Sequence, residues 1–262
     1  MSEKTVKNNE DTVKTLLEET RVFEPSQEFK VSAGVRDESI YEEAKQNREV
    51  FWEKQAGRLE WFKKWDKVLD WNPPFAKWFV GGKLNASYNC LDRHIQSGQG
   101  TKTAILWEGE RGEKKTLTYQ DVYDAVNKFA NGIKSLGIGK GDRVAIYMPM
   151  IPQAAIAMLA CARIGAIHSV VFGGFAAKEL AIRIDDAEPK VVVSASCGIE
   201  IEKIIPYKPL LDNAIELSTH KPSSCIIYQR EQLSADMHSG RDHNWQILMD
   251  SAKRIAPVPV KS

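Results

Sequence analysis

The fold is decided by the stretch from Arg143 to Phe172, which reads RVAIYMPMIPQAAIAMLACARIGAIHSVVF. Arg143–Tyr147 and Ile167–Phe172 are short apolar runs rich in β-branched residues, which is typical of buried strands. Ile151–Ile164, between them, has the length and composition of a core helix, and Gly165 follows it as a helix stop. The stretch therefore predicts one strand–helix–strand unit with parallel strands.

The same alternation continues on both sides of this unit. Upstream, two strands joined by a polar turn predict a hairpin, and the capping box Thr118-x-x-Asp121 starts a helix that ends near Leu136. Strands and helices then alternate one for one, which predicts an α/β fold with a doubly wound, mostly parallel sheet buried on both faces. The other elements that we expect are strands at 103–108, 115–117, 190–195 and 224–228, and helices at 176–186, 210–217 and 244–254.

The first hundred residues differ from the rest in composition and show no regular alternation of strands and helices. Residues 1–30 are polar and are expected to be mobile, apart from one short helix over 13–23. Residues 31–98 form a predicted extension that is helical from 38 to 58 and then rich in tryptophan. We interpret the tryptophans as an extended arm that packs on the body, in preference to a stacking surface for bases or sugars. Residues 99–262 form the predicted α/β subdomain.

Composition excludes several classes of protein. The 262 residues carry 36 Lys+Arg against 35 Asp+Glu, and this balance argues against nucleic acid as a partner. No apolar stretch approaches the roughly 20 residues of a membrane span, and the N-terminus has no apolar signal core. The four cysteines form no C-x-x-C pair, so we expect neither a zinc site nor a disulfide framework, and we expect a cytoplasmic protein.

Two glycine-rich segments differ in what they predict. Gly137-x-Gly139-Lys140-Gly141 follows a helix and precedes a strand, the reverse of a phosphate loop, so we interpret it as a helix stop and turn. Phe172-Gly173-Gly174-Phe175 leaves a strand and enters a helix, the place where open α/β sheets bind ligands. Ligand contact and a plain tight turn are both open for this segment. No metal-ligating cluster and no catalytic triad can be assembled from the sequence.

Several longer strings resemble the acetyl-CoA synthetase family, the AMP-forming short-chain acyl-CoA synthetases of the acetyl and propionyl type within the adenylate-forming superfamily. They occur in the order found in the N-terminal portion of that family. The strings are AKWF (76–79) with GG (81–82), LNASYNCLDRH (84–94), LTY (117–119), GDRVAIYMP (141–149) and ACARIGAIHSVVFGGF (160–175).

The resemblance implies a ligase that works in two steps. ATP, with Mg²⁺, and acetate would give an acetyl-adenylate and pyrophosphate, and the CoA thiol would then attack the adenylate. It also implies a CoA site built from Phe172, Gly173 and Gly174, together with two positions before Ile205-Pro206 that are arginine in the family. Those positions are Glu200 and Lys203 here.

Glu200 departs from the family pattern in a way that matters for CoA. A carboxylate close to a phosphate is unfavourable, so CoA is held differently or Glu200 turns away. Lys208 is a candidate substitute cation. A glutamate at this position also resembles the propionyl-type branch, so propionate remains an alternative to acetate.

The family's phosphate loop, its acyl pocket and its adenylation lysine have no counterpart in this sequence. We therefore expect a chain truncated before the phosphate loop, without catalytic residues of its own and inactive alone, whose partner is the remainder of the synthetase. A non-catalytic module that binds CoA or a protein partner is the alternative. A nicotinamide-dependent oxidoreductase is disfavoured, because no strand-G-x-G-x-x-G-helix unit is present.

Overall fold

The computed structural model describes residues 22–174, 176–252 and 260–261. It divides into two compact units, residues 1–52 and 53–262, which we describe separately. The helix predicted over 13–23 lies outside the described residues except for Val22 and Phe23, which are not helical, and Phe175 also lies outside them.

The first unit consists of short helices. α2 (Gln27–Ser32) is capped by Ser26, whose hydroxyl accepts a hydrogen bond from the Phe29 amide at 3.2 Å. The helical stretch predicted over 38–58 is two helices, α3 (Ser39–Gln46) and α4 (Arg48–Ala56). They separate at Asn47, whose backbone is extended and whose side chain accepts from the Val50 amide. An asparagine at this place ends one helix and caps the next.

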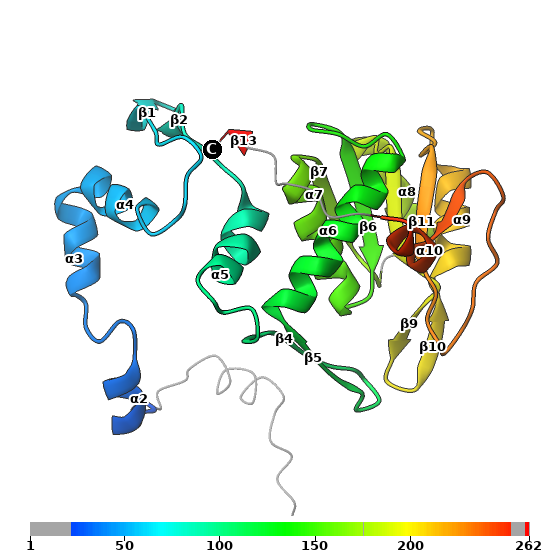
Figure 1. Ribbon diagram of the computed structural model, residues 1–262, viewed down its shortest axis with the longest axis horizontal. Coiled ribbons are helices and arrows are strands. Elements are labelled where there is room, and N and C mark those ends of the chain that lie inside the picture. The colour runs from blue at the N-terminus through cyan, green and yellow to red at the C-terminus, as the bar shows by residue number, and fades with distance from the viewer. Residues whose placement is uncertain (1–21, 175, 253–259, 262) are drawn as a thin grey trace, which may run out of the picture. The chain divides into compact units, whose positions relative to one another are not determined.

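The second unit is built on a five-stranded sheet with the order β12-β11-β8-β6-β7 (Figure 1). Every neighbouring pair in it is parallel, as the sequence predicts. The strands are β6 (Arg143–Met148), β7 (Ile167–Phe172), β8 (Val191–Ala195), β11 (Ser224–Tyr228) and β12 (Asp242–Asn244).

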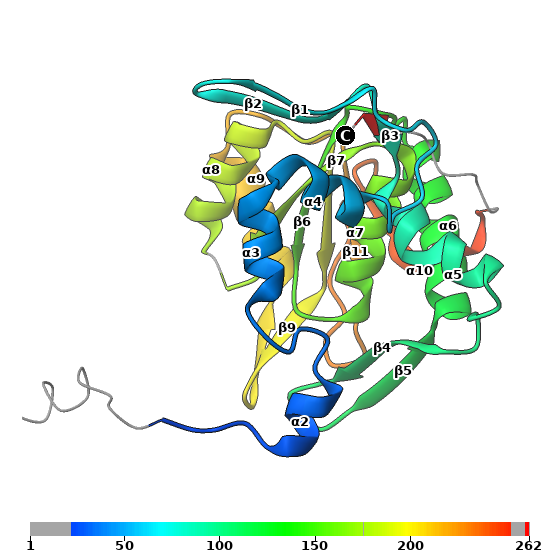
Figure 2. The same ribbon diagram turned by 90° about the vertical axis from the view of Figure 1, so that its left-hand side faces the viewer.

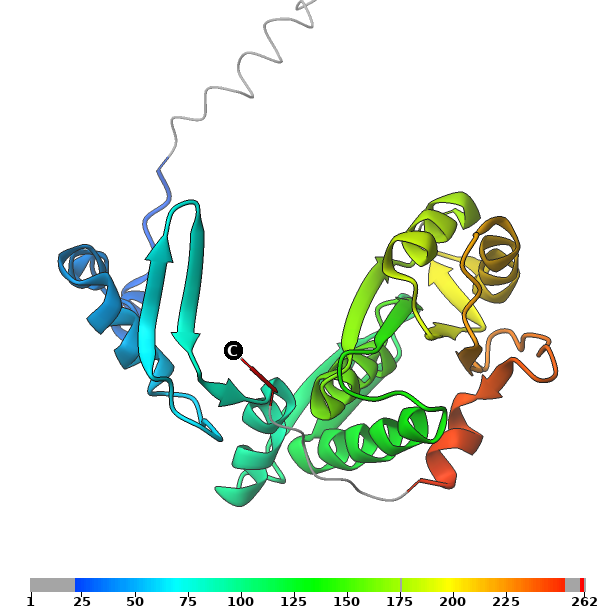
Figure 3. The same cartoon turned by 90° about the horizontal axis from the view of Figure 1, so that it is seen from above.

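Helices cover both faces of this sheet. α6 (Tyr119–Ser135), α7 (Pro152–Ile164) and α10 (Trp245–Asp250) contribute to one apolar cluster, in which Phe129 stacks on Trp245 at 3.8 Å. α8 (Ala177–Ala187) and α9 (Tyr207–Leu217) contribute to the other cluster. Figure 3 shows the two groups of helices on opposite sides of the strands. The doubly wound fold is therefore confirmed.

The edge strand β7 is an exception to the predicted burial. Residues of β6 and β8 are buried almost throughout, but Ile167 and Val170 of β7 are each 56% exposed. The prediction that the strands are buried on both faces is wrong here, because β7 pairs with β6 alone among the described strands.

The predicted hairpin and capping box are confirmed. β4 (Thr103–Glu108) pairs with β5 (Lys114–Thr118), and the side chains of Thr118 and Asp121 each bond to the other residue's backbone amide. A second hairpin, which the sequence did not predict, is formed by β9 (Cys197–Glu200) and β10 (Lys203–Pro206). The two hairpins extend at the same end of the sheet (Figure 2).

The segment before the sheet contains three short strands. β1 (Lys67–Asn72) pairs with β2 (Phe75–Val80) across a cis Pro73–Pro74 bond, and β3 (Lys83–Leu84) pairs with β13 (Val260–Lys261). Trp61, Trp65 and Phe79 lie within 5.5 Å of one another, ring centre to ring centre, and Trp65 is buried. This agrees with a packing role for these two tryptophans, whereas Trp71 is 54% exposed.

A buried ion pair connects this segment to the sheet. The short π-helix Tyr88–Asp92 runs into α5 (Arg93–Gln96), and it presents Asp92 to Arg163 of α7. The guanidinium donates two hydrogen bonds to the carboxylate, at 2.7 and 2.9 Å, and a third to the Asn127 amide oxygen at 2.9 Å. The Asn85 side chain donates to the Ala162 carbonyl of the same helix at 2.8 Å. Arg163 and Asp92 are 1% and 6% exposed, so both charges depend on this geometry.

Replacing Arg163 with methionine should lower the free energy of unfolding by about 3–5 kcal/mol, because the Asp92 carboxylate would stay buried without its partner. Chemical denaturation monitored by circular dichroism measures this loss. The double variant Arg163→Met, Asp92→Leu should recover part of the loss, since both charges are then removed.

The matched control is Lys67→Met, which breaks a surface pair of similar length, 2.8 Å, with Asp70. It should leave the unfolding midpoint nearly unchanged, since both side chains lie in water. Equal losses of unfolding free energy in Arg163→Met and Lys67→Met would show that the buried pair contributes no more to stability than the surface pair.

Candidate functional site

The candidate site lies at the carboxyl ends of the central strands. In the sheet, β6 lies between β7 and β8. The chain passes from β6 to β7 on one side and then crosses to β8 on the other side, so β6 lies at the switch point of the sheet. The Phe172-Gly173-Gly174 turn leaves β7, and the β9–β10 hairpin follows β8. The two segments therefore flank the end of β6, where open α/β sheets bind ligands.

The turn after β7 requires glycine at one position. A Cβ atom at residue 173 would lie 2.5 Å from the Tyr207 hydroxyl and 3.0 Å from the Met148 carbonyl oxygen. The second contact is with backbone, which cannot move aside easily. At Gly174 the nearest atom would belong to the Phe172 ring, which is 67% exposed. The turn thus packs tightly on its inner side and presents an aromatic ring outward.

The β9–β10 hairpin brings together the other two predicted residues. Glu200 and Lys203 are directly opposite each other at its tip, and both are exposed. Neither side chain makes a hydrogen bond or an ion pair with another residue that the structure describes. The tip is held by Arg111 of the β4–β5 turn, whose guanidinium donates to the Glu202 carbonyl at 3.1 Å.

Tyr207 links the turn to the hairpin. Its side chain is the nearest neighbour of a Cβ built at Gly173 in the turn, and also of one built at Gly198 in β9. Tyr207 therefore contacts the turn at Gly173 and the hairpin at Gly198, while Glu200 and Lys203 lie further along the hairpin, at its tip. The sequence missed Tyr207 because the predicted helix began at Leu210, whereas α9 begins at Tyr207.

The prediction of Lys208 as a substitute cation for CoA is wrong. Its side chain is 3% exposed, and its ammonium lies 2.6 Å from an Asp212 oxygen and 2.9 Å from an Asp242 oxygen. Arg241 pairs with the same two carboxylates. The charge of Lys208 is therefore satisfied inside the protein, whereas Lys203 is exposed.

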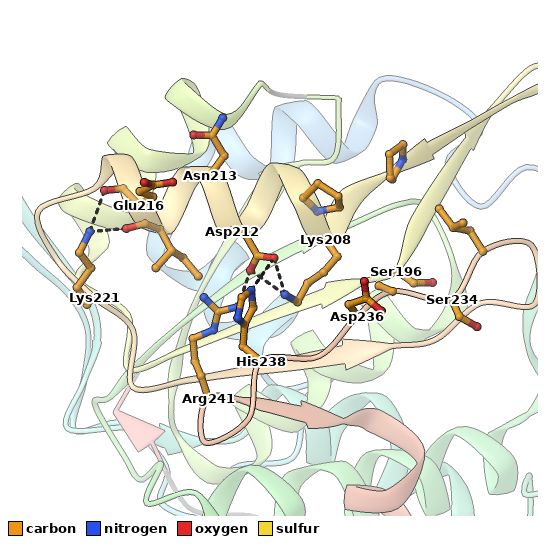
Figure 4. Close-up of a pocket in the computed structure, with 15 residues that line it drawn as sticks. Ser196, Lys208, Asp212, Asn213, Glu216, Lys221, Ser234, Asp236, His238 and Arg241 are labelled. Atoms are coloured by element: carbon orange, nitrogen blue, oxygen red, sulfur yellow. Dashed lines mark hydrogen bonds and ion pairs between the residues drawn. The ribbon is translucent and has the colours of Figure 1, made fainter.

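This ionic network lies at a separate cavity of about 990 Å³ (Figure 4). The cavity lies between α9 and the segment from Leu233 to Arg241, and none of the five predicted site residues lines it. Arg241, Lys208 and His238 are grouped around Asp212, so the charged side chains there bind one another.

Neither a metal centre nor a membrane segment is found in the part of the chain that the structure describes. No three His, Cys, Asp or Glu side chains are grouped to hold an ion there, and no helix there is long and apolar enough to cross a bilayer. Cys90, Cys161, Cys197 and Cys225 are free thiols.

Comparison with known proteins gives two matching family models. The model described as "AMP-binding enzyme" matches residues 91–259, and "Acetyl-coenzyme A synthetase N-terminus" matches residues 37–90.

Curated relatives match almost the whole chain. An acetyl-coenzyme A synthetase of Rubrobacter xylanophilus is 51% identical over 91% of this chain and 37% of its own length. One of Streptomyces coelicolor is 52% identical over 92% of this chain and 37% of its own length. The mitochondrial acyl-CoA synthetase short-chain family member 3 of Rattus norvegicus is 49% identical over 82% of this chain and 32% of its own length. The chain thus spans about 37% of the length of the first of these relatives.

Among solved structures, an acetoacetyl-CoA synthetase from Streptomyces lividans aligns with a TM-score of 0.76 and 21% identity. The alignment covers 90% of this chain and 39% of that one. At this identity it shows the shared fold.

The ionic network predicts how stability depends on pH. Burial raises the pKa of Asp242, but hydrogen bonds from Arg241 and Lys208 outweigh burial and lower the pKa to about 2. A carboxyl whose pKa is lower in the folded state stabilises the protein above its unfolded pKa, near 3.9. We therefore expect the free energy of unfolding to fall between about pH 4 and pH 2.

Urea denaturation at steps across this range measures the loss. In Asp242→Asn the acid-dependent loss should be smaller than in the unchanged chain, although the variant is less stable at pH 7. Identical pH profiles for the two proteins would contradict this role of Asp242.

Proposed function

The chain belongs to the AMP-binding enzyme family, and from this premise we propose that it forms the N-terminal part of an AMP-forming acetate–CoA ligase. The whole enzyme joins acetate to ATP, giving acetyl-adenylate and pyrophosphate. The CoA thiol then displaces AMP and leaves acetyl-CoA. Acetate, CoA and ATP with Mg²⁺ are the proposed substrates, and the remainder of the synthetase is the proposed partner. Supporting this are the two family models and the relatives named acetyl-coenzyme A synthetase.

The part of this function that we assign to the chain is a CoA half-site. The observation that carries it is the close approach of both the Phe172-Gly173-Gly174 turn and the β9–β10 hairpin to Tyr207, beside the switch point of the sheet. The turn offers an exposed ring and a close backbone for the nucleotide of CoA, and Lys203 offers a charge for a phosphate. Glu200 opposes that charge and weakens the site.

The four free cysteines support a reducing compartment, and we place the reaction in the cytoplasm. Propionate is the second candidate substrate, and the glutamate at position 200 is the observation that favours it.

An activity assay tests the division of labour between this chain and the rest of the synthetase. The purified chain, given ATP, Mg²⁺ and acetate or propionate, should release no pyrophosphate above background. The charge that develops on the transferring phosphates needs preorganised donors, and the family's phosphate loop has no counterpart in its sequence. Release of pyrophosphate would contradict the expected inactivity of the chain alone and place an ATP site within these 262 residues.

A charge reversal tests the CoA site itself. Calorimetry should detect CoA binding to the chain, and Glu200→Arg should tighten it by roughly 5- to 10-fold at low salt, since a repulsive charge is replaced by an attractive one. The gain should shrink as salt rises.

Glu202→Arg, two residues away in the same turn, changes the net charge equally and is the matched control. It should change the CoA affinity by less than roughly 2-fold, because solvent and salt screen a charge that does not face a phosphate of CoA. An equal gain in both variants would show a general charge effect, and no gain in Glu200→Arg would remove the hairpin from the CoA site.

A further inference from the structure

Tyr207 is held rigidly between the two segments of the candidate site. It is the first residue of α9 and is 6% exposed. Its ring stacks on Tyr147 of β6, with centroids 5.0 Å apart and an interplanar angle of 25°. Its amide donates to the Ser196 carbonyl at 3.0 Å, at the end of β8. The ring therefore has a fixed position at the switch point.

The Tyr207 hydroxyl has no hydrogen-bond partner among the residues that the structure describes. A hydroxyl deprived of water and left unpaired costs stability, so such a group in a buried side chain needs an explanation. The residue is 6% exposed, and its hydroxyl lies where the turn after β7 and the start of β9 approach each other.

Two glycines make room for this hydroxyl. A Cβ at Gly173 would lie 2.5 Å from the oxygen, and one at Gly198 would lie 2.8 Å from it. Any other residue at either position would push against the tyrosine. The turn after β7 and the strand after β8 thus both approach Tyr207 closely at the edge where the ligand would lie.

Resting on the proposed CoA half-site, we propose that the Tyr207 hydroxyl donates a hydrogen bond to the nucleotide half of CoA, the 3′-phosphorylated adenosine diphosphate. Tyr207 is a binding residue in this assignment and takes no part in the chemistry of acyl transfer.

The chemistry of the phenol suits this role. Burial raises the pKa of Tyr207, so the group carries its proton at neutral pH and can donate. A phosphate oxygen is a strong acceptor, and hydrogen bonds to charged groups are stronger than those between neutral groups. At an edge where Glu200 reverses the expected charge, a neutral donor supplies a phosphate contact that needs no cation.

The test is Tyr207→Phe in the full chain. Phenylalanine keeps the ring and its stacking on Tyr147 and removes only the oxygen. Calorimetry with CoA should show roughly 10-fold weaker binding, the usual effect of losing one hydrogen bond to a charged acceptor. Adenosine 3′,5′-bisphosphate should lose affinity similarly, whereas the low affinity of pantetheine should not change.

A spectroscopic measurement separates ligand contact from a structural role. When a tyrosine hydroxyl gains an acceptor, its near-ultraviolet absorption shifts to longer wavelength. Addition of CoA should produce this difference spectrum in the unchanged chain and not in Tyr207→Phe. Tyr228→Phe, which removes a hydroxyl from a ring packed in the apolar cluster on the other face of the sheet, is the matched control and should keep both the CoA affinity and the spectral shift.

Each outcome separates the two proposals. CoA binding that is equal in the unchanged chain and in Tyr207→Phe, with no spectral shift, overturns the role of Tyr207 and leaves the CoA site standing. A loss confined to pantetheine also overturns it. Failure of the unchanged chain to bind CoA overturns the half-site, and the role of Tyr207 with it.

Discussion

The buried ion pair between Asp92 and Arg163 is the constraint on which the second unit depends. Two opposite charges taken out of water must meet in good geometry, since either one alone would cost several kcal/mol, by order of magnitude. The pair joins residues 71 positions apart and places α7 against the segment from Asn85 to Asp92. That segment spans the boundary between the two family models, at residues 90 and 91. Asp92, within the family string at 84–94, therefore has a structural contact in this chain.

α7 connects this ion pair to the candidate site. α7 packs on β6, and β6 ends at Met148, whose carbonyl closes the inner side of the Gly173 turn. On the other face of the sheet, Tyr147 of β6 stacks on Tyr207, which contacts both the turn and the β9–β10 hairpin. Buried strands and stacked rings thus support the base of the candidate site.

Short-range patterns in the sequence predicted most of the fold. Apolar runs, helix caps and glycine stops gave the five alternating strand–helix steps, because each depends on neighbours within a few residues. The position of Phe172-Gly173-Gly174 after a strand predicted a ligand-binding turn for the same reason.

The β9–β10 hairpin escaped prediction because its strands have four residues each and its turn carries Ile201 at φ 56°, where glycine or asparagine is usual. Lys208 was misjudged because Asp242, one of its partners, lies far along the chain. Tyr207 was missed because the predicted helix began at Leu210, whereas α9 begins three residues earlier.

Hydrogen–deuterium exchange with and without CoA locates the proposed CoA half-site, at the ends of β7 and β8, without any substitution. We expect slower exchange on CoA addition in residues 172–174 and 197–207, and no change in residues 233–241 beside the 990 Å³ cavity. Protection centred on residues 233–241, with none at the turn and the hairpin, would contradict this half-site.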